Sequence, residues 1–155
     1  SASESKMTKS SIKSNFSLKA IKVYQESGTY KIKDYYNYLE LLSSTTSSDS
    51  LKSEVKLSLF SLFKDSNTKV FDVTSSVDTT VSLLQLVHKI ENKDYTFKIS
   101  KFENSIVGID FWTTKYELEI KKDDDIFTKE IKQQIFFIPT LKKFGKKTKE
   151  TPLTE

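Results

Sequence analysis

The residues best suited to proton-transfer chemistry lie in one stretch of the C-terminal third. Asp110, Trp112 and Tyr116 are separated by even numbers of residues, so in a β-strand they would point to the same side. Desolvation among aromatic rings raises the pKa of a carboxyl group, which could then move a substrate proton. The competing interpretation is an exposed Asp110 near a bend of the strand.

Other polar groups point less clearly to chemistry. His88 is the only imidazole and lies off the apolar face of its predicted helix, so we expect it to be exposed or at the boundary of the core. As a general base it would need a carboxylate partner. The run Asp123-Asp124-Asp125 lacks the spaced oxygen ligands and the glycine of a calcium loop, which indicates a solvated turn. The absence of cysteine excludes disulfides and thiol catalysis, and we expect no metal or cofactor.

The positive charge is concentrated at the ends of the chain. The net charge is +4, but residues 16–141 carry 17 lysines against 18 acidic residues. A nucleic-acid-binding domain concentrates cations on its folded body, and arginine is its usual phosphate and guanine ligand. Since the chain has no arginine, we expect no binding of nucleic acid.

Composition divides the chain into three parts. Residues 1–15 are rich in Ser and Lys and indicate a flexible leader, residues 16–141 form a single α+β domain, and residues 142–155 form a basic flexible tail. No run approaches the roughly 18 apolar residues of a membrane span. A start at Ser1 is compatible with a processed precursor, exported or tethered to an envelope, and the location stays open.

The rest of the chain is organised around a predicted long hairpin. Residues 105–121 pair with residues 126–140 across Asp123-Asp124-Asp125, and the apolar residues on each arm change face partway along. Because strand side chains alternate strictly, this change predicts either a bulge, for which Gly108 is the candidate, or two covered faces. We expect a bent and strongly twisted ribbon.

Upstream, helices alternate with short strands. The predicted elements are a helix from Phe16 interrupted at Ser27-Gly28, a helix over 30–42, a linker over 43–50, a helix capped by Ser50, a strand over 69–74, a helix capped by Thr79 or Thr80, and a strand over 95–100. Each helix is amphipathic and needs an apolar partner surface. The fold class is therefore α+β, with N-terminal helices packed on a strongly curved antiparallel sheet whose C-terminal strands form the hairpin.

This order of elements carries a family resemblance. An aromatic helix pair (Tyr24, Tyr30, Tyr35, Tyr38) precedes the Val-Phe-Asp-Val strand at 70–73, and together with the terminal meander it resembles the nuclear transport factor 2-like family of cone-shaped domains. The resemblance implies a pocket between helices and sheet, dimerisation through the open sheet face, and roles from isomerases and dehydratases to non-catalytic binding modules. Cystatin-like and helix-grip architectures remain open.

Two functional hypotheses follow. The first is a non-catalytic module that binds a protein partner or a small apolar ligand and can form a homodimer through its sheet face. The second is a small isomerase-type or dehydratase-type pocket enzyme. The predicted pocket residues are Trp112, Tyr116, Asp110 and Tyr38; the interface residues are Phe111, Ile109, Phe136 and Ile138; the catalytic residues of an enzyme would be Asp110, Tyr116 and Asp72.

Overall fold

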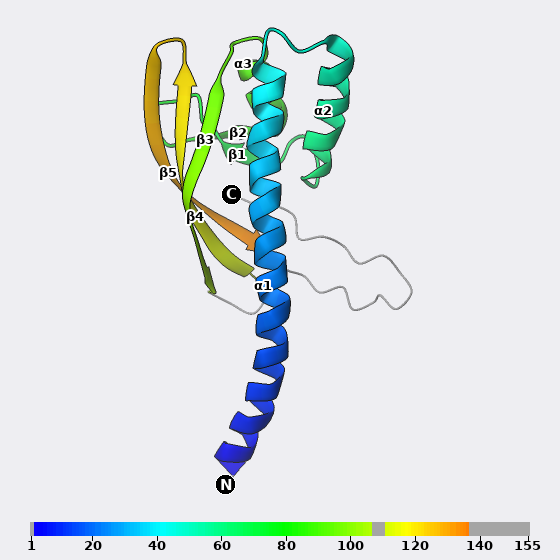
Figure 1. The fold of residues 1–155 in the computed structure, drawn as a ribbon, viewed down its shortest axis with the longest axis vertical. Coiled ribbons are helices and arrows are strands. Elements are labelled where there is room, and N and C mark those ends of the chain that lie inside the picture. Colours follow the sequence, from blue (N-terminus) through cyan, green and yellow to red (C-terminus); the bar gives the residue numbers. More distant parts are fainter. Residues whose placement is uncertain (1, 107–110, 137–155) are drawn as a thin grey trace.

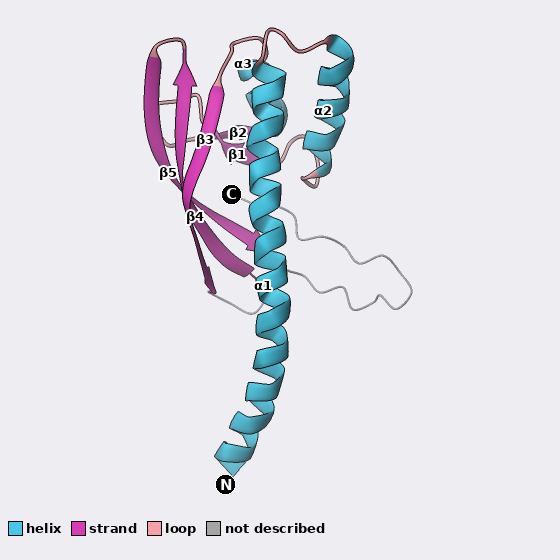
Figure 2. Ribbon diagram, viewed as in Figure 1, coloured by secondary structure: helices cyan, strands magenta, loops and turns pink. Residues whose placement is uncertain are grey.

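The protein combines three helices with two antiparallel sheets (Figure 1, Figure 2). This computed structural model describes the backbone of residues 2–106 and 111–136 and the side chains of residues 22, 23, 25–105 and 112–134. The α+β class is confirmed. The elements are α1 (Ala2–Ser43), α2 (Asp49–Ser61), β1 (Lys69–Phe71), β2 (Thr80–Ser82), α3 (Leu83–Ile90), β3 (Thr96–Ile106), β4 (Phe111–Lys122) and β5 (Asp125–Phe136).

Helix α1 is continuous, so the predicted interruption at Ser27-Gly28 is wrong. A glycine inside a helix costs about 1 kcal/mol, but Gly28 is buried, and the packing of the helix on its neighbours offsets that cost. The backbone is also helical over residues 2–15, where the sequence indicated a flexible leader. Elongating an existing helix requires no new nucleus, which explains how a segment without apolar periodicity can continue it.

The two shorter helices begin at serine caps. The Ser48 hydroxyl oxygen accepts the Leu51 N–H at 3.1 Å, so the cap of α2 lies two residues before the predicted cap at Ser50. Ser82 forms a capping box with Gln85 at the start of α3. A cap at Thr79 or Thr80 was expected instead. Residues 80–82 are extended as strand β2, which pairs with β1, and this pairing moves the start of α3 to Leu83.

The predicted hairpin is present with shorter arms. Strands β4 and β5 pair without a break from Phe111 opposite Phe136 to Lys122 opposite Asp125, around the turn Asp123-Asp124. Residues 105 and 106, which were assigned to the first arm, belong to β3. The hairpin is thus the middle and one edge of a three-stranded sheet with the order β3-β4-β5.

The sheet bends without a bulge in the β4–β5 pairing. The register shift lies instead between β3 and β4, at Ser100 to Glu103, where Lys101 has a φ of 58°. The pairing of β4 with β5 shows no bulge over the described pairs, and Gly108, the residue proposed for a bulge, lies outside the described residues. Figure 2 shows the lower halves of the strands turning away from the upper halves. An extra residue on one strand is a known cause of such a bend.

The core lies between the helices and one face of this sheet. Along β4 every second residue is buried, from Trp112 to Ile120, so the sheet has one inner face over this length. Each large apolar side chain buried there contributes about 1.5–3 kcal/mol. The core side chains are Ile32, Tyr35, Tyr36, Leu39 and Leu42 from α1; Val55 and Leu59 from α2; Leu83, Leu86, Val87 and Ile90 from α3; Trp112, Tyr116, Leu118 and Ile120 from β4; Val70 from β1; Ile131 from β5; and Phe63 and Val73 from the connecting segments.

Candidate functional site

A row of polar residues crosses the inner face of the sheet. Asn104, Thr114 and Gln133 stand opposite one another on β3, β4 and β5. Thr114 is buried, and its hydroxyl donates to Asn104 Oδ1 at 2.6 Å. Buried polar groups need such partners, because an unsatisfied one costs about 1–3 kcal/mol. The inner face is therefore apolar over its upper half and partly polar below.

Two buried tyrosines extend this row to α1. Tyr116 donates its hydroxyl hydrogen to Gln133 Oε1 at 3.0 Å, and its oxygen lies 2.8 Å from the hydroxyl oxygen of Tyr36. Since a tyrosine hydroxyl has one hydrogen, the hydrogen in the second bond comes from Tyr36. The two rings also meet edge to face, with centroids 5.9 Å apart. This chain of hydrogen bonds fixes α1 against β4 and β5.

Burial makes both tyrosines unsuited to proton exchange at neutral pH. Desolvation raises the pKa of Tyr36 and of Tyr116 well above the usual value for a phenol. Both hydroxyls therefore stay protonated at neutral pH and act as hydrogen-bond donors within the fold. The geometry gives Tyr116 a positioning role between helix and sheet.

Asp72 lies elsewhere, in the segment that joins β1 to β2. Its side chain is 1% exposed and accepts hydrogen bonds from the backbone N–H of Thr74 at 3.0 Å, the Thr74 hydroxyl and Lys89 Nζ. Burial alone would raise the pKa of Asp72, but the bonds from Lys89 and Thr74 outweigh it and lower the pKa. The carboxylate is thus ionised and held by its neighbours. No contact in the described part of the chain joins it to the tyrosine pair.

The predicted pocket residues are only partly brought together. Trp112 and Tyr116 share the inner face, as expected, and Trp112 is 2% exposed. Its Nε1 has no hydrogen-bond partner in the part of the chain that the structure describes. Tyr36, rather than the predicted Tyr38, is the helix residue that bonds Tyr116; Tyr38 is half-buried at the edge of the core. Asp110 lies outside the described residues.

Tyr36 could have been found from the sequence. It lies four residues after Ile32 and three before Leu39, both of which are buried, so a wider helical stripe would have included it. What the sequence could not supply is its partner, since Tyr116 lies 80 residues further along the chain.

The predicted interface residues fall at the open end of the hairpin. Phe111 and Phe136 stand opposite each other, at positions that alternate with the inner-face residue Trp112. Ile109 and Ile138 lie outside the described residues, and dimerisation through the sheet face stays a prediction. Further along, the outer face is charged, with ion pairs between Lys101 and Glu117 at 3.2 Å and between Lys115 and Glu130 at 3.4 Å.

The remaining candidates are surface groups. His88 is exposed, as expected, and Asp123, Asp124 and Asp125 are exposed at the hairpin turn. Among the side chains that the structure describes, no group of three or more acidic, histidine or cysteine residues is placed to hold a metal ion. Among the described helices, none has the length and apolar character needed to cross a membrane.

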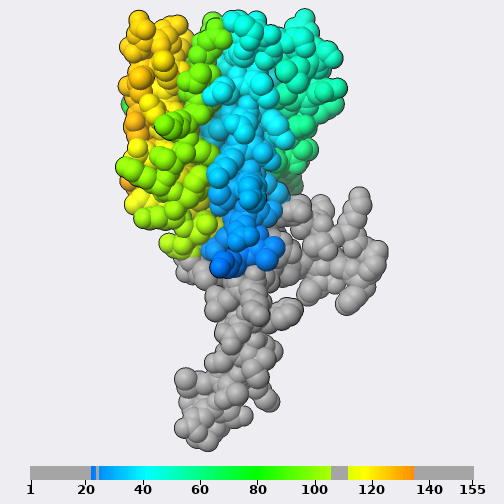
Figure 3. Space-filling model, in the orientation of Figure 1, coloured from blue at the N-terminus to red at the C-terminus, as the bar shows by residue number. Residues whose placement is uncertain are grey.

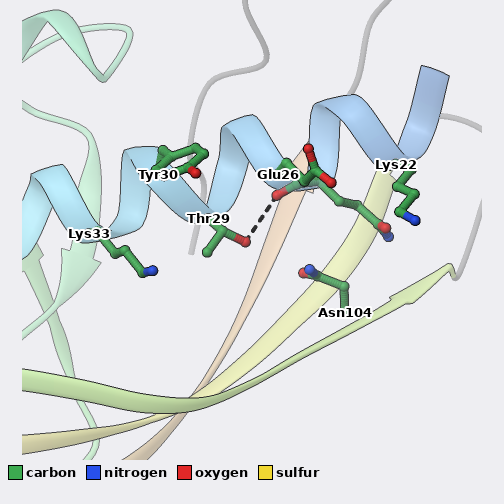
Figure 4. A pocket seen from close by; sticks show the side chains of 7 residues that line it. Lys22, Glu26, Thr29, Tyr30, Lys33 and Asn104 are labelled. Atoms are coloured by element: carbon green, nitrogen blue, oxygen red, sulfur yellow. Dashed lines mark hydrogen bonds between the residues drawn. The ribbon is translucent and has the colours of Figure 1, made fainter. Parts of the chain in front are cut away.

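A groove of about 280 Å³ lies between α1 and β3, and Asn104 of the polar row is one of its lining residues. Figure 4 shows the Asn104 side chain pointing from the sheet toward α1, with Lys22, Glu26, Tyr30 and Lys33 along the helix. The helix side is lined by Lys22, Gln25, Glu26, Thr29, Tyr30 and Lys33. The Thr29 hydroxyl donates to the Gln25 carbonyl oxygen at 3.0 Å and is thereby held against the helix.

Tyr30 is the prominent apolar group of this groove. It is 66% exposed, and Lys33 Nζ lies 5.9 Å from its ring centroid and equally far from that of Phe102. Val23, two turns earlier on the helix, is 64% exposed. In Figure 3 the exposed face of α1 runs beside β3. An aromatic ring, an aliphatic side chain and two lysines are thus offered to solvent along one helix.

A second groove, of about 560 Å³, lies between the segment after β1 and strand β5. It is lined by Thr74, Ser76, Asp78, Phe127, Thr128, Lys129 and Glu130. Lys129 Nζ donates to the Asp72 carbonyl oxygen at 3.4 Å. This bond connects β5 to the segment after β1.

Comparison with known proteins gives no relative: the chain matches no protein family, no curated protein and no solved structure.

Proposed function

We propose that this chain is a non-catalytic binding module with the cone architecture of the nuclear transport factor 2-like family, and that the groove between α1 and β3 holds a segment of a protein partner. The observation that carries the proposal is the groove itself, in which an exposed aromatic ring and two lysines stand over the polar end of the sheet.

The internal polar groups support a binding role over a catalytic one. The hydroxyls of Tyr36 and Tyr116 are buried and bonded within the fold, and the Asp72 carboxylate is occupied by Lys89 and Thr74. A general base needs a free lone pair within hydrogen-bond reach of its substrate. These groups instead use their hydrogen bonds to position helices and strands.

The lining of the groove favours a peptide over a small apolar molecule. Small-molecule sites are usually enclosed clefts of about 300–1,000 Å³ with mostly apolar walls. This groove is open, measures about 280 Å³, and has charged or amide side chains at five of its seven lining positions. A peptide with an apolar side chain beside an acidic one matches it, the first packing on Tyr30 and the second meeting Lys33 or Lys22.

Selection from a random peptide library displayed on phage tests the proposal. The wild-type protein is the bait, and the double variant Tyr30→Ala/Lys33→Glu is the counter-selection. Both side chains are exposed, so the fold should tolerate the changes. We expect enriched peptides to share an apolar-acidic pattern and to bind the wild type at least about 10-fold more tightly than the variant, a difference of about 1.4 kcal/mol.

The matched control is Leu57→Ala, because Leu57 is 73% exposed on α2, away from the groove. It should bind the selected peptides as the wild type does. Peptides without a shared pattern, or equal affinity for the wild type and the Tyr30/Lys33 variant, would contradict the proposal.

A further inference from the structure

The two edge strands of the three-stranded sheet differ in the hydrogen-bond partners of their backbone. On β3, the Phe97 N–H donates to Glu40 Oε1 at 2.9 Å, and just before the strand the Tyr95 N–H donates to Ser43 Oγ at 2.7 Å. Side chains of α1 therefore accept two backbone N–H groups at the start of this edge. Strand β5 forms the opposite edge and is 12 residues long. Long open edges of this kind are templates for pairing with another strand.

The hairpin register shows which backbone groups of β5 are open. Lys122 and Asp125 flank the two-residue turn. In such a hairpin the two flanking residues form backbone hydrogen bonds with each other, and along the strands hydrogen-bonded pairs then alternate with pairs that are not hydrogen-bonded. The odd-numbered residues of β5 thus bond to β4, and Thr128, Glu130 and Lys132 direct their N–H and C=O groups outward. No backbone hydrogen bond from these three reaches any described residue outside the sheet.

Charge favours an axis at Ile131 over an axis at either neighbouring residue, Glu130 or Lys132. If β5 pairs antiparallel with a second copy about a two-fold axis at Ile131, Glu130 stands opposite the partner's Lys132, and the reverse pair forms on the other side of the axis. An axis at Glu130 or at Lys132 would instead place like charges opposite each other. Directly opposed opposite charges stabilise a sheet by about 0.2–1 kcal/mol per pair, and like charges destabilise it.

Within one chain, neither Glu130 nor Lys132 has an opposite charge directly across the hairpin. Glu117 stands directly opposite Glu130, and Lys115 directly opposite Lys132. Glu130 reaches Lys115 diagonally at 3.4 Å, but Lys132 has no ion-pair partner among the described residues. A second copy in this register supplies a carboxylate beside each unmatched lysine.

The second groove leaves room for this pairing. It lies beside Phe127 to Glu130, against the segment after β1. In the register about Ile131, Lys129 stands opposite the partner's Gln133, which would lie at the mouth of this groove. The space of about 560 Å³ can therefore take side chains from the inner face of the added strand.

We propose that the chain forms a two-fold homodimer by pairing its β5 edges about Ile131, which joins the two three-stranded sheets into one of six strands. This association is independent of the groove between α1 and β3 and differs from dimerisation through the sheet face, because it uses backbone hydrogen bonds and the Glu130–Lys132 charges.

Sedimentation equilibrium on the full chain tests the pairing through a charge exchange. The wild type should be a dimer, and Glu130→Lys or Lys132→Glu alone should raise the dissociation constant at least about 10-fold, since each places like charges opposite each other. The double variant Glu130→Lys/Lys132→Glu should recover most of the affinity. Lys121→Glu, which changes an exposed charge on β4, is the control and should leave the dimer intact.

A backbone variant checks the result independently of charge. Thr128→Pro removes an outward N–H that β4 does not use, so the monomer should keep its fold by far-UV circular dichroism, and the dimer should weaken. A wild type that stays monomeric at all concentrations would overturn the proposal. So would a dimer in which the double variant is no tighter than the single ones, or one that Phe136→Ser dissociates while the charge variants do not.

Discussion

The Asp72 carboxylate holds the segment between β1 and β2 through bonds from Thr74 and Lys89. Because its pKa is lowered in the fold, the stabilisation is complete above the unfolded pKa, near 3.8, and is lost as the pH falls through the folded pKa. Asp72→Asn should cost about 1.5–3 kcal/mol in the free energy of unfolding at neutral pH. Urea denaturation at pH 7 and at pH 3 measures this, and the difference from the wild type should shrink at pH 3.

The same segment provides a control in Asp78, whose side chain is exposed. Asp78→Asn should change the unfolding free energy by no more than about 0.5 kcal/mol at either pH. If Asp72→Asn lost the same stability at pH 7 and pH 3, the carboxylate would not be the group that bonds Thr74 and Lys89.

At the scale of single residues, the sequence predicted where side chains lie better than it predicted what they do. It placed Trp112 and Tyr116 on one face because strand alternation is local. It named Asp72 as a catalytic candidate on the family resemblance, and the sequence alone does not show whether such a carboxyl group is free or fully bonded. Lys89, which decides between these states, lies 17 residues away, and its contact exists only in the folded chain.

At the scale of elements, the edge of β3 depends on α1. The Phe97 N–H has Glu40 Oε1 as its acceptor, so Glu40→Ala should leave that amide open to water. We expect hydrogen exchange at Phe97 to become at least about 10-fold faster, a change of about 1.4 kcal/mol, because a hydrogen bond to a charged group contributes about 1.5–3 kcal/mol. Two-dimensional NMR of exchanging amides gives the rate for this residue.

The conservative variant Glu40→Gln keeps an acceptor oxygen in the same place. It should preserve most of the protection at Phe97. Equal exchange in the wild type and in Glu40→Ala would mean that another group covers this edge.

The elements themselves differ in how far the sequence predicted them. The alternation at residues 95–99 and the turn at Asp123-Asp124 predicted β3 and the β4–β5 hairpin, because both signals are local. Strand β2 was missed, since three residues form a strand only when a partner such as β1 is present. The continuity of α1 through Gly28 was missed for the same reason: the packing that offsets a glycine is tertiary.

At the scale of the whole molecule, charge on the folded body is balanced. Lysines and acidic residues pair across the outer face, as in Lys101 with Glu117 and Lys115 with Glu130, and residues 16–141 carry almost equal numbers of each. A polyanion is bound by a concentration of cations, with an affinity that falls steeply with salt. The basic segment at 142–155 is therefore the part of the sequence best suited to bind one.

Heparin chromatography tests whether polyanion binding depends on the basic segment rather than on the folded body. Replacing the five lysines of the basic segment by Gln in the full chain should abolish retention at about 0.15 M salt, because lysines and acidic residues are almost equal in number over residues 16–141. Replacing Lys98, Lys121 and Lys122 by Gln should leave retention unchanged. Retention that survives the first change and is lost in the second would place a polyanion site on the sheet. The substituted lysines are Lys142, Lys143, Lys146, Lys147 and Lys149.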